Sequence, residues 1–221
     1  MPIQAVLFDH DGTLVNSEPT HLKLWNAVLS DYGVELSDQE YKDRYAGVPT
    51  PTNASDLISR FRIPTTAENL IAAKQRQTKK YLEEQSFPLM PGASETILAL
   101  HKLGLKLGVV TGASAHGLGV TLRTNKFESL FSLTVSGGDV LRSKPAPDCY
   151  LLALEHLSLQ PEHCIAIEDT EHGLRAAAAA GIRCLAIPTD MSKHHDFSLA
   201  TAVLPDMNAA FEYIKERSAH A

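Results

Sequence analysis

The motif Asp-His-Asp-Gly-Thr-Leu at residues 9–14 limits the possible folds of this chain more than any other segment. It follows residues 5–8, a short apolar run that is typical of a buried strand. Carboxylates two residues apart at a strand end, before a glycine turn, would face the crevice where open parallel sheets bind ligands. Like charges this close repel each other strongly. The motif therefore predicts a nearby cation, or different roles for Asp9 and Asp11.

A calcium-binding loop or a simple turn is the alternative interpretation of Asp-x-Asp-Gly, because Asp and Gly both favour turns. A calcium loop needs further oxygen ligands along its residues and a terminal Glu. Here the segment becomes apolar at Leu14 and Val15. The turn interpretation also leaves the preceding strand unexplained.

Bulk properties narrow the function classes. The chain has 221 residues, 44% of them hydrophobic and 21% charged, enough for one domain or one domain with an insert. A formal net charge of -6 argues against a nucleic acid or an anionic membrane as partner. Cys149, Cys164 and Cys184 lack CxxC spacing and are expected to be reduced thiols. No leader-like or membrane-spanning apolar run is evident, so we expect a cytoplasmic protein, a monomer or a weak homodimer.

Strand and helix patterns alternate along most of the chain. Apolar runs predict buried strands at 3–8, 106–111, 133–136, 164–167, 183–187 and 202–204. Helical spacing predicts helices at 94–103, 148–157 and 171–180, the last ending in five alanines and Gly181. This alternation predicts a doubly wound parallel α/β sheet of the Rossmann-like type.

Residues 16–86 interrupt this alternation with helical patterns alone. One helix is expected at 19–32, with an apolar stripe that includes Leu22, Trp25 and Tyr32. Two more are expected to begin at capping boxes whose first residues are Ser37 and Thr65. We therefore expect a core domain of residues 1–15 and 87–221, and an all-helical cap domain of residues 16–86. Hinges are expected near 15–18 and 84–90.

Three more polar motifs follow later strands. Thr111-Gly112 follows the second strand, Lys144 precedes a helix, and Glu168-Asp169 follows the fourth strand. Each is weak evidence alone, since a single Lys is usually a solvated surface charge and Glu-Asp is often a helix cap. Together with the first motif they would gather acidic groups, a hydroxyl and an ammonium at one edge of the sheet. That combination favours phosphoryl transfer.

The motif order resembles that of the haloacid dehalogenase-like phosphatase superfamily over nearly the whole chain. The helical insert is similar to the C1 cap of the beta-phosphoglucomutase and phosphoglycolate phosphatase subgroup. The resemblance implies a Mg²⁺-dependent phosphatase for a small phosphorylated metabolite, such as a sugar phosphate or phosphoglycolate. The reaction would proceed through an aspartyl-phosphate intermediate.

The resemblance also implies roles for individual residues. Asp9 would be the nucleophile, and Asp11 the general acid and then the general base. Lys144 would neutralise charge on the nucleophile and the phosphoryl group. Thr111 and the amide of Gly112 would bind phosphoryl oxygens.

Mg²⁺ is the cofactor that the resemblance implies. Asp9, Asp169 and the main-chain carbonyl of Asp11 would bind it, with Glu168 acting through water or from behind these ligands. Glu18, His21 and His116 are possible substrate contacts. His10 is expected to turn away from the two aspartates and is assigned no chemistry. His194 and His195 are interpreted as part of a polar surface loop.

Departures from the subgroup pattern bear on the choice of reaction. A mutase of this subgroup carries cationic cap residues that bind a second phosphate, whereas residues 46–50 here are Ala-Gly-Val-Pro-Thr. Their absence favours hydrolysis over a beta-phosphoglucomutase-type phosphomutase. A catalytically silent ligand-binding protein with this fold is a further alternative. A phosphonate hydrolase would need a Schiff-base Lys, for which Lys23 and Lys42 are candidates by location, and Asp11 argues against a dehalogenase.

Overall fold

A computed structural model of the chain describes residues 1–218, and its centre is a parallel sheet. The sheet has six strands in the order β3-β2-β1-β4-β5-β6, and every neighbouring pair is parallel. The strands are β1 (Ala5–Phe8), β2 (Lys106–Val110), β3 (Leu133–Val135), β4 (Cys164–Glu168), β5 (Arg183–Ala186) and β6 (Ala202–Val203). The expected doubly wound α/β fold is confirmed.

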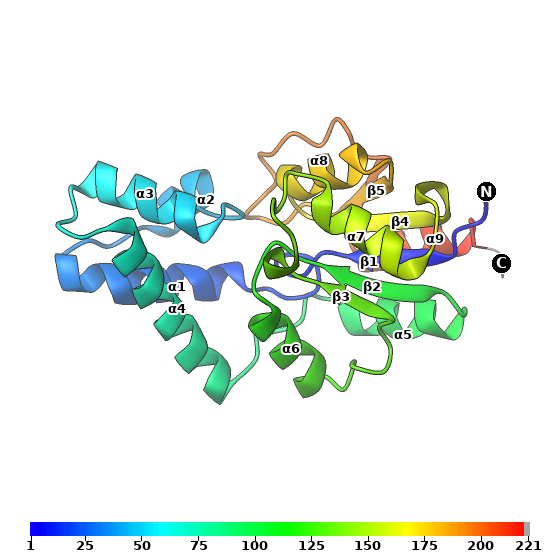
Figure 1. The fold of residues 1–221 in the computed structure, drawn as a ribbon, viewed down its shortest axis with the longest axis horizontal. Coiled ribbons are helices and arrows are strands. Elements are labelled where there is room, and N and C mark those ends of the chain that lie inside the picture. The colour runs from blue at the N-terminus through cyan, green and yellow to red at the C-terminus, as the bar shows by residue number, and fades with distance from the viewer. Residues whose placement is uncertain (219–221) are drawn as a thin grey trace.

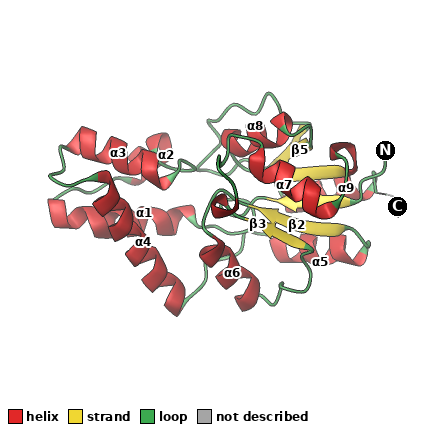
Figure 2. Ribbon diagram, viewed as in Figure 1, coloured by secondary structure: helices red, strands yellow, loops and turns green. Residues whose placement is uncertain are grey.

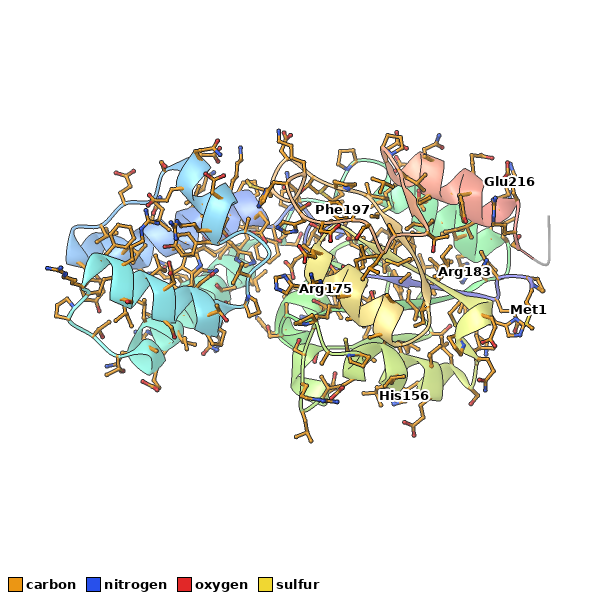
Figure 3. The ribbon with its side chains drawn as sticks, turned by 90° about the horizontal axis from the view of Figure 1, so that it is seen from above. Met1, His156, Arg175, Arg183, Phe197 and Glu216 are labelled. Atoms are coloured by element: carbon orange, nitrogen blue, oxygen red, sulfur yellow. The ribbon has the colours of Figure 1, made fainter. Side chains whose placement is uncertain are left out.

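Helices cover both faces of this sheet, as a doubly wound fold requires. One face carries α5 (Ala93–Lys102), α6 (Ala115–Thr124) and α9 (Met207–Lys215), and the other carries α7 (Asp148–Leu157) and α8 (Glu171–Ala179). Alternation along β1 decides which side chains each layer meets, because Val6 and Phe8 join the first cluster and Ala5 and Leu7 the second. Figure 3 shows the two layers on opposite sides of β1. Two short 3-10 helices, η2 (Gly137–Asp139) and η3 (Pro161–His163), lie in the connections.

Four helices between β1 and α5 form a separate group at the carboxyl ends of the strands (Figure 1). They are α1 (Glu18–Leu29), α2 (Asp38–Arg44), α3 (Thr50–Phe61) and α4 (Ala67–Glu84), with a 3-10 turn η1 (Ser30–Tyr32) after α1. This group has its own hydrophobic cluster, in which Trp25, Leu57 and Leu70 are buried. Figure 2 shows the same division, with helices alone on one side and all the strands on the other.

Two segments connect the helical group to the sheet, and they run side by side. The amide of Asn16 donates a hydrogen bond to the carbonyl of Pro88 at 2.8 Å, and Val15 forms an antiparallel bridge with Leu89. Val15, Leu82 and Phe87 form a small hydrophobic cluster beside this junction. The junction is therefore packed rather than an open linker.

Side-chain N-caps begin two helices of the helical group, and the sequence predicts one of these N-caps correctly. The side chain of Ser37 accepts the amide of Glu40 at 3.2 Å, which confirms that cap. The expected cap Thr65 is wrong by one residue, because Thr66 accepts the amide of Asn69 and begins α4. A Thr-Thr pair offers two equivalent hydroxyls, and only the backbone conformation decides between them.

Three helices and one expected apolar position differ from expectation. Helical spacing does not predict α3, α6 and α9, and α6 contains Gly117 and Gly119, which lower helix propensity. Tyr32 is 37% exposed, because the apolar stripe of α1 ends where the chain enters the 3-10 turn. The three cysteines are free and buried.

Within residues 1–218, none of the helices has the length and apolar character needed to cross a membrane.

Candidate active site at the switch point of the sheet

The candidate site lies where the strand order reverses. From the central pair β1 and β4, the sheet grows through β2 and β3 on one side and through β5 and β6 on the other. Such a switch point leaves a crevice at the carboxyl ends of the strands. Asp9 follows β1, Glu168 ends β4, and the amide of Asp9 donates to the carbonyl of Ile167 at 2.9 Å. The expected strand-end residues are therefore brought together.

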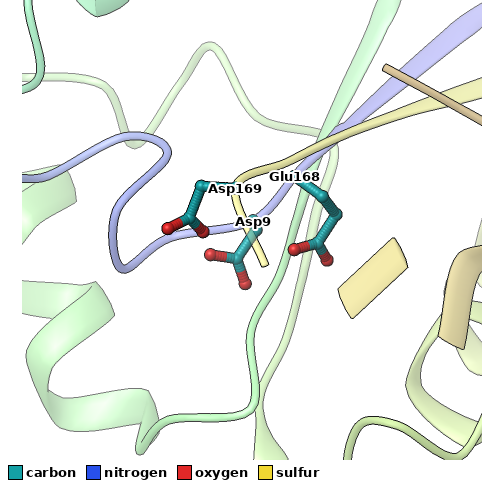
Figure 4. Close-up of side chains that lie close together, drawn as sticks. All are labelled: Asp9, Glu168 and Asp169. Atoms are coloured by element: carbon teal, nitrogen blue, oxygen red, sulfur yellow. The ribbon is translucent and has the colours of Figure 1, made fainter. Parts of the chain in front are cut away.

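Three buried carboxylates form an acidic cluster in this crevice. One oxygen each from Asp9, Glu168 and Asp169 lies within 4.8 Å of the others. Their residues are 7%, 0% and 3% exposed. Figure 4 shows Glu168 approaching Asp9 from one side and Asp169 from the other. An arrangement of this kind concentrates negative charge away from water.

Lys144 supplies positive charge inside the cluster. Its Nζ donates to Asp9 Oδ1 at 2.5 Å, to Glu168 Oε1 at 2.6 Å and to the carbonyl of Val110 at 2.7 Å. The Lys144 side chain is 8% exposed. The fixed contacts show that this Lys is a member of the site and not a solvated surface charge.

Burial and mutual repulsion shift the titration of these groups. Burial raises the pKa of Glu168 to about 7, although Lys144 opposes the shift. Burial, assisted by Asp9 and Glu168, also raises the pKa of Asp169 well above its ordinary value, and burial raises that of Asp9 despite Lys144. For Lys144, burial lowers the pKa, but Asp9 and Glu168 outweigh it and raise the pKa above its usual range. One ammonium therefore faces three carboxyl groups, and negative charge is in excess.

The cluster fits a divalent metal ion. Glu168 Oε2 is buried and has no hydrogen-bond partner among residues 1–218, so one acidic oxygen is left for a ligand. Mg²⁺ prefers oxygen ligands, and such sites often supply one or two carboxylates while water completes the shell. Asp9, Glu168 and Asp169 together offer this donor set, and a divalent cation would offset their excess charge.

Thr111 and Gly112 lie beside the cluster at the end of β2. Thr111 is 1% exposed, and its Oγ1 accepts the amide of Ala113 at 3.0 Å, which leaves its hydroxyl hydrogen available to another acceptor. A Cβ on Gly137 would lie 2.3 Å from the carbonyl oxygen of Gly112, so the two loops touch through backbone alone. Ser143 Oγ also lies close to Gly112. The end of β2 thus presents a hydroxyl and a backbone edge to the crevice.

Asp11 is held by histidines, and the expectation for His10 is wrong. His10 Nδ1 lies 3.2 Å from Asp11 Oδ2, so the ring faces Asp11 instead of turning away. His21 Nε2 lies 3.7 Å from Asp11 Oδ1. Burial would raise the pKa of Asp11, but the two histidines hold it well below its ordinary value. The contact is possible because the chain leaves β1 at Phe8, so the alternation of side chains along a strand no longer sets the direction of His10.

Glu18 and His21 on α1 have partners within the protein. Glu18 Oε2 accepts from the Tyr41 hydroxyl at 2.6 Å, and its Oε1 accepts from the amide of Gly47 at 3.0 Å. His21 faces the site, because it lies between Asp11 and Lys74, whose Nζ is 3.2 Å from His21 Nδ1. These contacts place α1 at the border between the helical group and the site.

The remaining candidate residues lie on α6, in the helical group and in the loop after β5. His116 is exposed in the first turn of α6, Lys23 is exposed on α1, and Lys42 forms an ion pair with Asp38 at 2.6 Å on α2. His194 and His195 lie in the loop after β5, with ring centroids 4.6 Å apart. His195 Nδ1 accepts the amide of Glu171 at 3.3 Å.

Two further residues belong to the site although no motif predicts them. The hydroxyl of Tyr150 donates to Glu168 Oε1 at 2.5 Å, and Lys74 on α4 is 3% exposed beside His21. Tyr150 lies in a helix among apolar residues at helical spacing, and that pattern gives no indication of its hydroxyl contact. Lys74 gives no sequence signal, because a single Lys in an amphipathic helix is normally solvated.

Comparison with known proteins identifies the family. The family model of the haloacid dehalogenase-like hydrolases matches residues 6–187. The chain belongs to this family. The family that the motifs suggested is therefore confirmed, and with it the expectation of an enzyme of the hydrolase class.

Individual members of the family resemble the chain over most of its length. Protein CbbY of Cereibacter sphaeroides is 32% identical over 213 residues, 91% of this chain and 91% of that protein. Fructose-1-phosphate phosphatase YqaB of Escherichia coli is 30% identical over 179 residues, 80% of this chain and 93% of that protein. The solved structure of mutant CbbY from Rhodobacter sphaeroides with xylulose-(1,5)bisphosphate has a TM-score of 0.81 at 28% identity, and the match covers 93% of this chain and 95% of that one.

Proposed function

We propose that this haloacid dehalogenase-like hydrolase is a Mg²⁺-dependent phosphatase that hydrolyses a small sugar-type phosphate through an aspartyl-phosphate. The observation that carries the proposal is the contact of Lys144 Nζ with both Asp9 and Glu168, beside Asp169, at the switch point of the sheet. A carboxylate nucleophile needs nearby positive charge when it approaches an anionic phosphoryl group. The site provides that charge next to Asp9.

The acidic cluster would hold the metal ion. Asp9 and Asp169 are the proposed carboxylate ligands, with the main-chain carbonyl of Asp11, and Glu168 acts through water or from behind them. When bound, Mg²⁺ supplies positive charge that stabilises the phosphoryl oxygens. The excess of carboxylates over ammonium groups supports this assignment.

The proposed reaction divides into two half-reactions. In the first, a carboxylate oxygen of Asp9 forms a bond to phosphorus, the bond from phosphorus to the leaving oxygen breaks, and Asp11 gives that oxygen a proton. In the second, Asp11 takes a proton from water, the water oxygen attacks phosphorus, and Asp9 is released with inorganic phosphate. Thr111 and the amide of Gly112 bind phosphoryl oxygens, and Lys144 stabilises the negative charge that builds up.

The protonation of Asp11 must change between these steps. The two histidines keep its pKa low in the protein as described. An arriving phosphate brings negative charge, which raises the pKa of a neighbouring carboxyl group. Substrate binding thus favours the proton-donating form of Asp11, and departure of the leaving group restores the proton-accepting form.

The helical group α1–α4 supports a small-metabolite substrate. It lies over the carboxyl ends of the strands (Figure 1), where a cap would exclude water from a phosphorylated intermediate. The sugar-type class is proposed from the relatives, which include a fructose-1-phosphate phosphatase and a protein solved with xylulose-(1,5)bisphosphate. Residues 46–50 of the cap supply no cation for a second phosphate, which favours hydrolysis over a mutase reaction.

A phosphate-release screen tests the proposal. We expect Mg²⁺-dependent turnover of at least one sugar phosphate, loss of turnover with EDTA, and at least about a thousandfold loss in Asp9→Asn. Asp31→Asn, at an exposed position in η1, is the matched control and should retain activity. Inactivity towards every sugar phosphate, or full activity of Asp9→Asn, would contradict the proposal, and formation of an isomeric sugar phosphate would indicate a mutase.

A further inference from the structure

His10 lies between the proposed acid/base and helix α6. Its side chain is 1% exposed, with Nδ1 at 3.2 Å from Asp11 Oδ2 and Nε2 at 2.9 Å from Thr121 Oγ1. Thr121 is itself 1% exposed. Both ring nitrogens therefore have a polar partner, and burial prevents water from replacing either one.

The chemistry of the partners gives the hydrogen bonds a direction. A carboxylate only accepts, so Nδ1 carries the hydrogen that is donated to Asp11. In the neutral ring Nε2 then accepts, and the Thr121 hydroxyl is its donor. The resulting chain runs from Thr121 through His10 to Asp11. The Asp11 carboxylate thus fixes the tautomer of the ring, and the bond to Thr121 holds the ring in its orientation.

Asp11 needs such support because it stands on a turn rather than on the strand. β1 ends at Phe8, and a turn follows at residues 12–14, where the φ of Gly12 is +85°. The other carboxylate oxygen is 3.7 Å from His21 Nε2, which is too long for a hydrogen bond. Among the side chains of residues 1–218, His10 is the one that lies within hydrogen-bond distance of this carboxylate.

We propose that His10, anchored by Thr121, is a positioning residue that fixes the Asp11 carboxylate for proton transfer. The inference rests on the proposed phosphatase function, in which Asp11 acts as acid and then as base. Proton transfer requires the carboxyl oxygen within hydrogen-bond reach of the reacting atom, and a small displacement of a catalytic group lowers the rate steeply.

The two half-reactions can be separated with p-nitrophenyl phosphate. Its leaving group departs without a proton, so formation of the phosphoenzyme does not need Asp11 as acid, whereas hydrolysis of the phosphoenzyme needs it as base. In His10→Leu we expect a burst of about one p-nitrophenolate per active site, followed by a steady rate at least about tenfold below wild type. With a sugar phosphate, whose leaving group needs a proton, kcat should fall at least tenfold with little change in KM.

Substitution of His10 by each of the two amide residues distinguishes a positioning role from simple packing. The side-chain nitrogen of Asn is as far from Cβ as Nδ1 of His, and that of Gln is as far as Nε2. His10→Asn should therefore restore the donor to Asp11 and most of the rate, whereas His10→Gln should not. Thr121→Ser, which keeps the hydroxyl, should stay closer to wild type than Thr121→Val.

The results of these experiments can overturn the role of His10 without overturning the phosphatase function. Unchanged turnover in His10→Leu, or His10→Asn no faster than His10→Leu when both variants melt near the wild-type temperature, would overturn the positioning role while the phosphatase function stands. Equal slowing of the burst and of the steady rate would also overturn it. A wild-type protein that releases no phosphate from any substrate would overturn the proposed function and this inference together.

Discussion

Glycines make room for the acidic side chains of the site. A Cβ on Gly173 would lie 1.9 Å from Glu168 Oε2, and one on Gly12 would lie 2.1 Å from Asp169 Oδ2. Real Cβ atoms do not approach other atoms so closely. At Gly12 the positive φ adds a second reason for glycine. The carboxylates of Glu168 and Asp169 thus depend on two positions that carry no side chain.

Replacement of Gly173 tests this dependence. We expect Gly173→Ala to displace the Glu168 carboxylate, to lower stability by about 1–3 kcal/mol and to weaken the response of activity to Mg²⁺. Gly117→Ala is the control in another helix, because its Cβ would meet Leu82 at an ordinary 3.7 Å. That change should raise stability by about 0.5–1 kcal/mol. Urea denaturation and Mg²⁺ titration of activity measure both, and equal behaviour of the two variants would contradict the expectation.

Lys74 is a buried amine, and its effect on the free energy of unfolding depends on pH. Its Nζ lies 3.2 Å from His21 Nδ1 and 5.5 Å from the centre of the Trp25 ring. Burial lowers the pKa of Lys74 to about 8 from 10.5, although Glu18 and Asp11 oppose the shift. Between these two pH values the unfolded chain binds more protons than the folded one, so this group makes the protein more stable as pH rises.

The variant Lys74→Met removes that dependence. The free energy of unfolding of the variant minus that of wild type should decrease from pH 8 to pH 10, by at most about 1.4 kcal/mol per pH unit. Urea denaturation at pH 7, 8, 9 and 10 measures the difference. Lys79→Met, at an exposed position of the same helix, should show a difference that does not vary with pH. A flat difference for Lys74→Met would mean that the amine is not buried in solution.

At the scale of single elements, the start of α4 is decided by one hydroxyl. Thr66 accepts the amide of Asn69, whereas the described hydrogen bond of Thr65 is made by its backbone amide to the carbonyl of Ile63. The backbone of Thr66 is extended, with ψ 159°, as an N-cap residue requires. Of these two adjacent threonines, only Thr66 therefore caps α4 with its side chain.

The two threonines provide a matched pair for measurement. Thr66→Ala should lower the free energy of unfolding by about 1 kcal/mol, because an amide of the first turn loses its acceptor. Thr65→Ala should change it much less. Thermal or urea unfolding of the two variants decides, and the prediction is wrong if Thr65→Ala is the more costly substitution.

At the scale of the whole molecule, the helical group and the sheet meet across a narrow junction. The hydrogen bond from Asn16 to Pro88 and the bridge between Val15 and Leu89 hold the two connections together. Contacts across the border include His21 with Asp11, and Met191 with the hydrophobic cluster of the helical group. We propose the junction as the hinge of a cap made of residues 16–86.

Closure of this cap predicts a change in shape. With Mg²⁺ and beryllium fluoride, which mimics a phosphorylated carboxylate, the radius of gyration should decrease towards the value of about 17 Å expected for a compact chain of 221 residues. Small-angle X-ray scattering measures it, with Asp9→Asn as the control that cannot form the adduct. Identical scattering with and without the analogue in wild type would contradict a moving cap.

Much of the fold was predictable from local patterns. Every expected strand is present, and β1, which was expected to begin at residue 3, begins at Ala5 because Ile3 forms only an isolated bridge with Ser218. Helix α6 was missed because two glycines weaken its pattern, and the cap of α4 was misplaced because Thr65 and Thr66 are chemically the same. Local sequence patterns do not predict an element or its first residue correctly where the alternative backbone conformations are nearly equal in energy.

The sequence by itself determined which polar groups meet in the crevice. Parallel strands end at one edge of a sheet, so Asp9, Thr111 and Asp169 gather there once the strands are recognised. Only the tertiary structure decided the partners of His10, the burial of Lys74 and the hydroxyl contact of Tyr150. These contacts join residues far apart in the chain, and no periodicity encodes which atoms of a buried side chain find a partner.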